Sequence, residues 1–268
     1  NAVASASVVL LADMLEDPIR RQRAQRLLSL ADGLVKEAQA ESLSEVSDVL
    51  RSGLTRRSLR LAGLLDRQHP ADQAEIEAAW ASFRDHRLSR ADASFPAVEA
   101  AVRLCRWLAT DDPTVSRGNF EQLTHRQLEV DAWVDAAVND AAAGVEDHRM
   151  ASGLERVLQR VREVRDAHDV EFATALARHS GSYGDVVPLE TLVADVVVPL
   201  AAASPTLLLV LDGLSTGVAT ELISSITSRP DVAMAEALLP ERDRRAAGLA
   251  VLPSVTEFSR TSLLTGRL

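Results

Sequence analysis

Apolar residues recur at the spacing of an α-helix through most of this 268-residue chain. Positions i, i+3, i+4 and i+7 of a helix share one face, so this spacing aligns apolar side chains that can pack on a neighbouring helix. The spacing predicts consecutive helices from residue 3 to about residue 185, and no strand-like alternation precedes Pro205. It is clearest at Leu27, Leu30, Ala31, Leu34 and Val35, at Val46, Val49, Leu50 and Leu54, and at Leu154, Val157, Leu158, Val161 and Val164.

Proline, glycine and short polar residues mark where these helices end. We expect breaks at Asp17–Pro18, His69–Pro70, Phe95–Pro96, Asp111–Gly118 and Ser180–Gly184. The last break, with the adjacent Asp185, is the best candidate for a domain boundary. The fold is therefore predicted to be mainly α, with an all-helical domain at 1–185 and a second domain at 186–268.

The second domain contains an uncharged run, Pro205–Leu211, that ends in the carboxylate of Asp212. A short apolar run of this kind is typical of a buried parallel strand, and such a strand would place Asp212 at the edge where open α/β sheets bind ligands. The flanking pattern predicts helices at about 188–202 and 215–228, a loop around 230–240, a short strand near 250–252 and a terminal helix at about 258–264. Residues 186–268 would thus contain a β-α-β-α unit.

A second informative segment runs from Leu252 to Gly266 with the sequence Leu-Pro-Ser-Val-Thr-Glu-Phe-Ser-Arg-Thr-Ser-Leu-Leu-Thr-Gly. It places Thr256 at the start of the terminal helix, where backbone N–H groups and the helix dipole favour an anion. Because parallel strands joined by a right-handed crossover end on one edge, we expect Asp212 and Thr256 to lie close together. A threonine hydroxyl needs a base or a metal to act as a nucleophile.

These two segments together resemble the PglZ family of the alkaline phosphatase superfamily, whose members belong to BREX and related phage-growth-limitation defence systems of bacteria. The resemblance covers roughly residues 186–268. It implies that Asp212 is a metal ligand and that Thr256 is both the nucleophile and a ligand. Ser259 and Arg260 match the family's Ser-Arg pair, and we expect them to anchor the loop or an anionic substrate.

The same resemblance implies metal-dependent hydrolysis of a phosphoester, including a phosphodiester, by a longer protein. Zinc is the expected metal, with manganese or magnesium as alternatives. Further Asp and His ligands would lie downstream of Leu268, so we expect the 268-residue chain to be inactive alone. The implied partners are other defence subunits, such as a methyltransferase or an ATPase, and nucleic acid is a candidate substrate of the full-length protein.

Two other functions compete with this one. Gly213-Leu-Ser215-Thr-Gly217 fits the G-x-S-x-G elbow of an α/β serine hydrolase, with Ser215 as the nucleophile. That interpretation leaves Asp212 and the 252–266 segment unexplained, and Ser215 also suits a helix N-cap. The other alternative is a helical scaffold without catalysis, since helices make up most of the chain.

Composition narrows the range of functions further. A formal net charge of −10 argues against strong nonspecific nucleic-acid binding by the chain as a whole. The longest uncharged stretch, at 196–211, is interrupted by Pro199 and Pro205, so no membrane-spanning helix is expected. The single cysteine, Cys105, lies in an apolar helical pattern beside Trp107 and predicts a buried thiol in a reducing cytoplasm.

Several other residues have ordinary structural explanations. The arginines at 20, 21, 23 and 26 and those at 56, 57 and 60 are expected on solvated helix faces. The three tryptophans are expected to anchor helix packing. The His125–Glu129 pair and the Asp166–His168–Asp169 cluster are expected to make surface or capping contacts, not to bind a metal.

Overall fold

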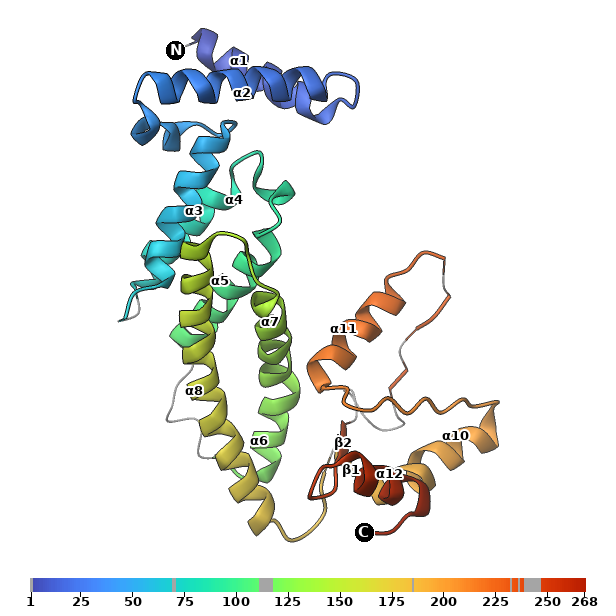
Figure 1. Ribbon diagram of the computed structural model, residues 1–268. Coiled ribbons are helices and arrows are strands. Elements are labelled where there is room, and N and C mark those ends of the chain that lie inside the picture. The colour runs from blue at the N-terminus through green and yellow to red at the C-terminus, as the bar shows by residue number, and fades with distance from the viewer. Residues whose placement is uncertain are drawn as a thin grey trace. The chain divides into compact units, whose positions relative to one another are not determined.

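The computed structural model describes residues 2–68, 71–110, 118–184, 186–231, 233–235, 237–238 and 247–268. Within these residues the chain is mainly helical, as predicted, with a two-stranded parallel sheet (Figure 1). It forms two compact units, Asn1–Asp111 with Ala137–Val164, and Asp112–Ala136 with Arg165–Leu268. This division passes through two helices, α7 and α8. The predicted boundary, the Ser180–Gly184 turn with Asp185, falls within the second unit, and Asp185 itself lies outside the described residues.

The first unit begins with a helical hairpin, α1 (Ala2–Glu16) and α2 (Arg21–Glu37), separated at the predicted Asp17–Pro18 break. A 3₁₀-helix η1 (Glu41–Val46) leads to α3 (Arg51–Leu65), and α4 (Gln73–Arg84), η2 (Ser89–Ala91) and α5 (Phe95–Thr110) follow. Asp32 of α2 caps the free backbone N–H groups in the first turn of α3. Its carboxylate accepts hydrogen bonds from the backbone N–H groups of Arg51 (3.1 Å) and Ser52 (3.2 Å). This contact fixes which side of α2 faces the unit.

Aromatic rings join α4 to α5 in the core of the first unit. The ring centroids of Trp80 and Phe95 are 5.3 Å apart. The Phe83 centroid lies 6.0 Å from that of Trp80 and 6.1 Å from that of Phe95. Trp80 and Trp107 are buried, as predicted for helix-packing anchors, and Trp133 is half-buried. The predicted break at Phe95–Pro96 is confirmed, because α5 begins at Phe95.

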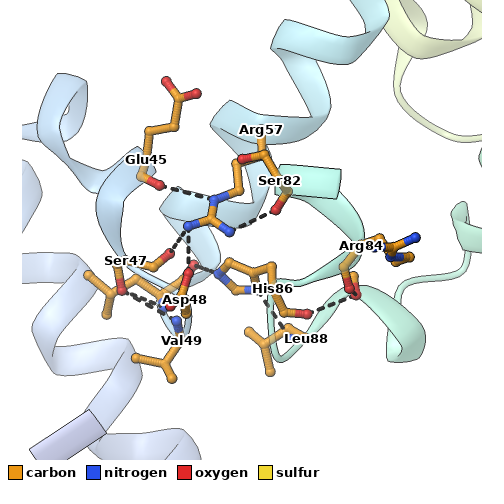
Figure 2. Close-up of polar contacts among 11 residues, drawn as sticks. Glu45, Ser47, Asp48, Val49, Arg57, Ser82, Arg84, His86 and Leu88 are labelled. Atoms are coloured by element: carbon orange, nitrogen blue, oxygen red, sulfur yellow. Dashed lines mark hydrogen bonds and ion pairs between the residues drawn. The ribbon is translucent and has the colours of Figure 1, made fainter. Parts of the chain in front are cut away.

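Arg57 of α3 lies inside this unit, and the prediction that it occupies a solvated face is wrong (Figure 2). Its guanidinium donates to the carbonyl oxygens of Glu45 (3.0 Å), Ser82 (2.7 Å) and Ser47 (3.3 Å) and pairs with the Asp48 carboxylate at 2.7 Å. Arginine can be buried here because every contact is a charge-assisted hydrogen bond. The arginines at 20, 21, 23, 26, 56 and 60 are exposed, as expected.

The second unit contains α6 (Phe120–Arg126), a π-helical turn η3 (Gln127–Asp131), and the parts of α7 (Ala132–Ala142) and α8 (His148–Arg178) that flank them. A capping box begins α6: Asn119 accepts from the N–H of Gln122, and the Gln122 side chain accepts from the N–H of Asn119. The predicted break at Ser180–Gly184 follows α8 and is confirmed. The predicted break at His69–Pro70 lies outside the described residues, and so do residues 111–117 of the predicted break at Asp111–Gly118.

The remainder of the second unit is the C-terminal α/β segment. Strand β1 (Val186–Pro188) leads into a continuous helical stretch of α9 (Leu189–Leu192), the π-turn η4 (Val193–Val197) and α10 (Val198–Ala203). Helix α11 (Thr216–Thr227), β2 (Ala247–Leu249) and α12 (Thr256–Thr265) follow. The three predicted helices of this segment are thus confirmed. The predicted loop at 230–240 is only partly described, since residues 232, 236, 239 and 240 are not.

The two strands predicted in this segment, at 205–211 and near 250–252, are not where the structure has its strands. Pro205–Leu211 is not a strand and is exposed, with Leu207 81% and Leu209 72% accessible to solvent. The sheet is instead formed by β1 and β2, which pair in parallel with Val187 opposite Gly248. A strand requires a neighbour for its backbone hydrogen bonds, and among the described residues β1 and β2 satisfy only each other. Apolar content alone could not identify the paired segments.

Candidate functional site

The candidate site residues Thr256, Ser259 and Arg260 lie in the helix α12, near its start. Val255 is the N-cap, with extended backbone dihedrals, and Thr256 is the first helical residue. No side chain caps this terminus within the described residues. The first-turn N–H groups therefore remain available to an anion, which the helix dipole also favours. Helix α12 begins two residues earlier than predicted, so Thr256 is at its start.

Arg260 of α12 forms an ion pair with Asp212, its Nη2 donating to the carboxylate Oδ2. Thr256 and Arg260 are four residues apart on one helix, which places them on the same face. The structure therefore brings Asp212 to the face of α12 that carries Thr256. Both charged side chains are about half exposed, at 49% and 53%, so the pair lies at the surface of the unit.

The route by which Asp212 reaches this position differs from the prediction. Asp212 follows the exposed Pro205–Leu211 segment and sits in a turn with Gly213, whose φ is +67°. It is therefore not at the carboxyl edge of a sheet. Glycine is required at position 213 because the left-handed region is costly for other residues. The Arg260 ion pair, and not strand pairing, determines where the carboxylate lies.

Ser215, the alternative nucleophile, is the N-cap of α11. Its Oγ accepts a hydrogen bond from the backbone N–H of Val218 at 3.3 Å. A nucleophile elbow needs a strand immediately before it, and residues 204–214 form none. The second glycine of the motif has a packing role, since a Cβ on Gly217 would lie 2.4 Å from the carbonyl oxygen of Ala132 in α7.

Ser259, the remaining residue of the Ser-Arg pair, is half-buried in α12, and its backbone N–H donates to the carbonyl of Val255 at 3.0 Å. The next serine, Ser262, is buried, and its Oγ has no hydrogen-bond partner among the described atoms. Leu263 is buried beside it and helps seat α12 on α9. Helix α12 thus packs through Ser262 and Leu263, and Thr256 and Arg260 are exposed beside this packed face.

A second group of charged residues is buried around the π-turn η3. It includes His168, so the prediction of a surface or capping contact is wrong for this residue, whereas Asp166 and Asp169 are exposed. Asp131 is 3% exposed and lies 2.8 Å from Arg165 and 3.5 Å from His168, both in α8. Arg165 also pairs with Asp135 at 3.0 Å. π-Turns of this kind occur often at functional sites. The only sequence signal for this buried cluster was the polar His168 within an apolar helical pattern, and that signal was not sufficient to predict it.

Burial and charge act against each other in this cluster. Burial raises the pKa of the Asp131 carboxyl, opposed by Arg165, His168 and Arg126. Burial lowers the pKa of the Arg165 guanidinium, but its hydrogen bond to Asp135 and the charge of Asp131 outweigh this and raise it. The cluster is thus a buried ionic network whose ion pairs link η3 and α7 to α8, although Asp131 Oδ1, Arg165 Nη1 and His168 Nδ1 make no hydrogen bond within the described part of the chain. The predicted His125–Glu129 pair, at 3.1 Å, is half exposed.

A cavity of 690 Å³ lies between α6 and the C-terminal half of α8. Its wall includes Asn119, Phe120, Glu171, Arg178 and His179. The Phe120 ring stacks on the His179 imidazole with centroids 4.5 Å apart. Glu171 Oε2 is buried and makes no hydrogen bond within the described part of the chain. Nothing in the sequence pattern indicated this cavity.

The described part of the chain contains no cluster of three or more His, Cys, Asp or Glu side chains that could hold an ion. Cys105, the single cysteine, is buried, as predicted, and burial raises the pKa of its thiol to about 11. A protonated, buried thiol is a poor ligand and a poor nucleophile.

Comparisons of the chain with protein-family models, with curated proteins and with solved structures gave no match. None of the described helices combines the length and the apolarity that crossing a membrane requires.

Proposed function

We propose that residues 186–268 carry part of the phosphoester-hydrolysing site of a PglZ-like phage-defence protein, with the complete site in a longer polypeptide. The Asp212–Arg260 ion pair carries the proposal, because it holds the Asp-Gly turn against the face of α12 that bears Thr256. These residues are far apart in the sequence. Their convergence supports a shared site.

Each group has a distinct chemical task in this proposal. The Arg260 guanidinium and the first-turn N–H groups of α12 bind phosphoryl oxygens, as charged donors and helix N-termini commonly do. The Thr256 hydroxyl attacks phosphorus and loses its proton, the ester oxygen leaves with the P–O bond electrons, and water then cleaves the threonyl phosphoester. Ser259, whose backbone N–H donates to the Val255 carbonyl, would help to anchor the loop before α12 or the anionic substrate.

The resemblance implies a divalent metal, with zinc favoured over manganese or magnesium. Asp212 and Thr256 offer two oxygen donors, whereas catalytic zinc sites use three protein ligands. These two residues therefore do not by themselves form a complete metal site. Asp212 Oδ1 makes no hydrogen bond to the described residues, so this oxygen is available to coordinate a metal. A bound metal would neutralise phosphoryl charge. We expect the 268-residue chain to bind zinc weakly and to lack hydrolase activity.

The test uses the longer protein with bis(p-nitrophenyl) phosphate as substrate and added zinc, manganese or magnesium. Thr256→Ala should remove nearly all turnover and leave the fold intact. Asp212→Asn should weaken metal affinity as well as rate, because an amide is a poorer ligand for a hard cation. Thr261→Ala, an exposed change on the same helix, is the matched control.

Ser215→Ala should be mild, because it removes only an N-cap worth about 1 kcal/mol. The proposal fails if turnover persists in excess EDTA and in Thr256→Ala but disappears in Ser215→Ala. That pattern would support the serine-hydrolase alternative, whose chemistry needs no metal. Robust hydrolysis by the 268-residue chain alone would show that the remaining groups lie within it.

A helical scaffold remains a second candidate function, favoured by apolar side chains exposed on the N-terminal helices. Leu30 and Leu34 of α2 are 67% and 65% exposed. Exposed apolar surface on a helix is typical of protein interaction. In a defence system the cytoplasmic partners would be a methyltransferase or an ATPase subunit, and co-purification of these subunits with the chain tests this function.

A further inference from the structure

Helix α2 carries more apolar surface than its neighbours cover. Ala24 and Leu28 are buried, but Leu27, Leu30 and Leu34 are 44%, 67% and 65% exposed. The three leucines are spaced at i, i+3 and i+7, so they form one continuous leucine stripe along the helix. This spacing is typical of a helix that packs lengthwise against another helix.

The charges that flank the leucine stripe have opposite signs at its two ends. Arg23 and Arg26 lie at the N-terminal end, and Glu37 lies at the C-terminal end. All three side chains are exposed, and none forms an ion pair with any side chain that the structure describes. At 100° per residue, Arg23 and Glu37 lie on the stripe side of the helix, with Arg26 beside Glu37 at its edge.

This charge pattern determines which partner and which orientation fit the stripe. In a parallel pair of α2 helices, Arg23 and Arg26 would face the same residues of the second copy and repel them. In an antiparallel pair centred between Leu30 and Ala31, the arginines of one copy would face Glu37 of the other. The same alignment places Leu27 opposite Leu34 of the second copy, so apolar and charged contacts form together.

We propose that two copies of this chain associate through antiparallel packing of their α2 helices along the leucine stripe. The arginine–glutamate contacts occur twice because of the two-fold symmetry. Helix α2 is about 26 Å long, and two such helices bury less than the roughly 1,600 Å² of a standard interface. The dimer is therefore reversible and concentration-dependent. This inference does not depend on the proposed hydrolase function.

Sedimentation velocity and light scattering on the purified 268-residue chain test the proposal over a range from about 1 µM to about 200 µM. We expect a monomer–dimer equilibrium within this range. Leu30→Glu should raise the dimer dissociation constant at least about tenfold, because it places a charge at the centre of the stripe. Ile19→Glu, at a position 92% exposed and outside α2, is the matched control and should change nothing.

Charge reversal tests the orientation. Arg23→Glu made together with Arg26→Glu should weaken the dimer, and so should Glu37→Arg alone. The variant that combines all three changes should restore it, because every symmetric arginine–glutamate contact is then inverted. Circular dichroism of each variant excludes unfolding as the cause. A chain that is monomeric throughout this range overturns the proposal. So does a dimer that survives Leu30→Glu, or one that the combined charge reversal does not restore.

Discussion

Arg260 and Asp212, which are 48 residues apart in the sequence, form an ion pair across the exposed face of α12. The two side chains are 53% and 49% exposed, so water screens their attraction. Surface ion pairs contribute about 0–1 kcal/mol to stability. The pair therefore orients the site without contributing much to the stability of the unit.

We accordingly expect Arg260→Ala and Asp212→Asn each to lower the free energy of unfolding by less than about 1 kcal/mol. Urea denaturation of the wild type and both variants measures this, and high salt should reduce the difference further. A loss of more than about 2 kcal/mol would show that the pair is buried in solution. Functional loss without stability loss is the outcome consistent with a site.

Arg57 should be far more important for stability than any surface arginine. Its guanidinium satisfies three backbone carbonyls and the Asp48 carboxylate (Figure 2). Arg57→Met removes the donor from three carbonyls of half-buried residues and from the exposed Asp48 carboxylate, so we expect a loss of about 1–3 kcal/mol in urea denaturation. Arg60→Met is the matched control: its side chain is 61% exposed, and it should lose less than about 1 kcal/mol.

Helical periodicity predicted most of the helices, because a buried face leaves a pattern that local sequence carries. The same reasoning failed for Pro205–Leu211, where an apolar run resembles a buried strand but has no strand beside it in the described structure. Pairing partners are a non-local property. The paired strands, β1 and β2, are three residues long, too short for a period of two to stand out from the surrounding sequence.

The candidate site could be predicted only in part, because some of its features have local sequence signals and others depend on contacts between distant residues. Thr256 could be placed because helix starts have local signals. Asp212 and Arg260 could be named, but their ion pair depends on how a turn and a helix fold together. Arg57 and Asp131 were missed because a buried charge is identified by its partners, which are distant in sequence.

Gly217 should be intolerant of any side chain. A Cβ there would lie 2.4 Å from the Ala132 carbonyl oxygen and 3.2 Å from the Ala136 nitrogen, both backbone atoms that cannot rotate away. We expect Gly217→Ala to destabilise the protein by about 1–3 kcal/mol, through displacement of α11 from α7. Gly63→Ala, within α3 and with no atom inside 4 Å of its Cβ, should instead stabilise by up to about 1 kcal/mol. Thermal unfolding of the two variants measures the contrast.

Cys105 should react slowly with thiol reagents in the folded protein. It is buried in α5, and burial raises its thiol pKa to about 11, so little thiolate exists near neutral pH. We expect Ellman's reagent at pH 8 to label the native chain far more slowly than the chain in urea. Equal rates in the two conditions would contradict the burial of this helix.

His86 should make stability depend on pH. Its Nδ1 accepts the N–H of Leu88 at 3.2 Å, and its Nε2 lies 3.0 Å from the Leu50 carbonyl, to which it can only donate. The imidazole is therefore neutral. Burial, and secondly the charge of Arg57, lowers its pKa below the ordinary 6.5. The unfolded chain consequently binds a proton at a higher pH than the folded chain.

It follows that the stabilisation from His86 is complete above pH 6.5 and is lost as pH falls from 6.5 through the folded pKa. Each unit of pKa difference corresponds to about 1.4 kcal/mol. We expect His86→Gln, which keeps a donor for the Leu50 carbonyl, to flatten the decrease in urea-unfolding free energy between about pH 7 and pH 5. His125→Gln, at a half-exposed position, is the matched control and should retain the wild-type slope. If both variants keep that slope, the imidazole of His86 is not the group that titrates.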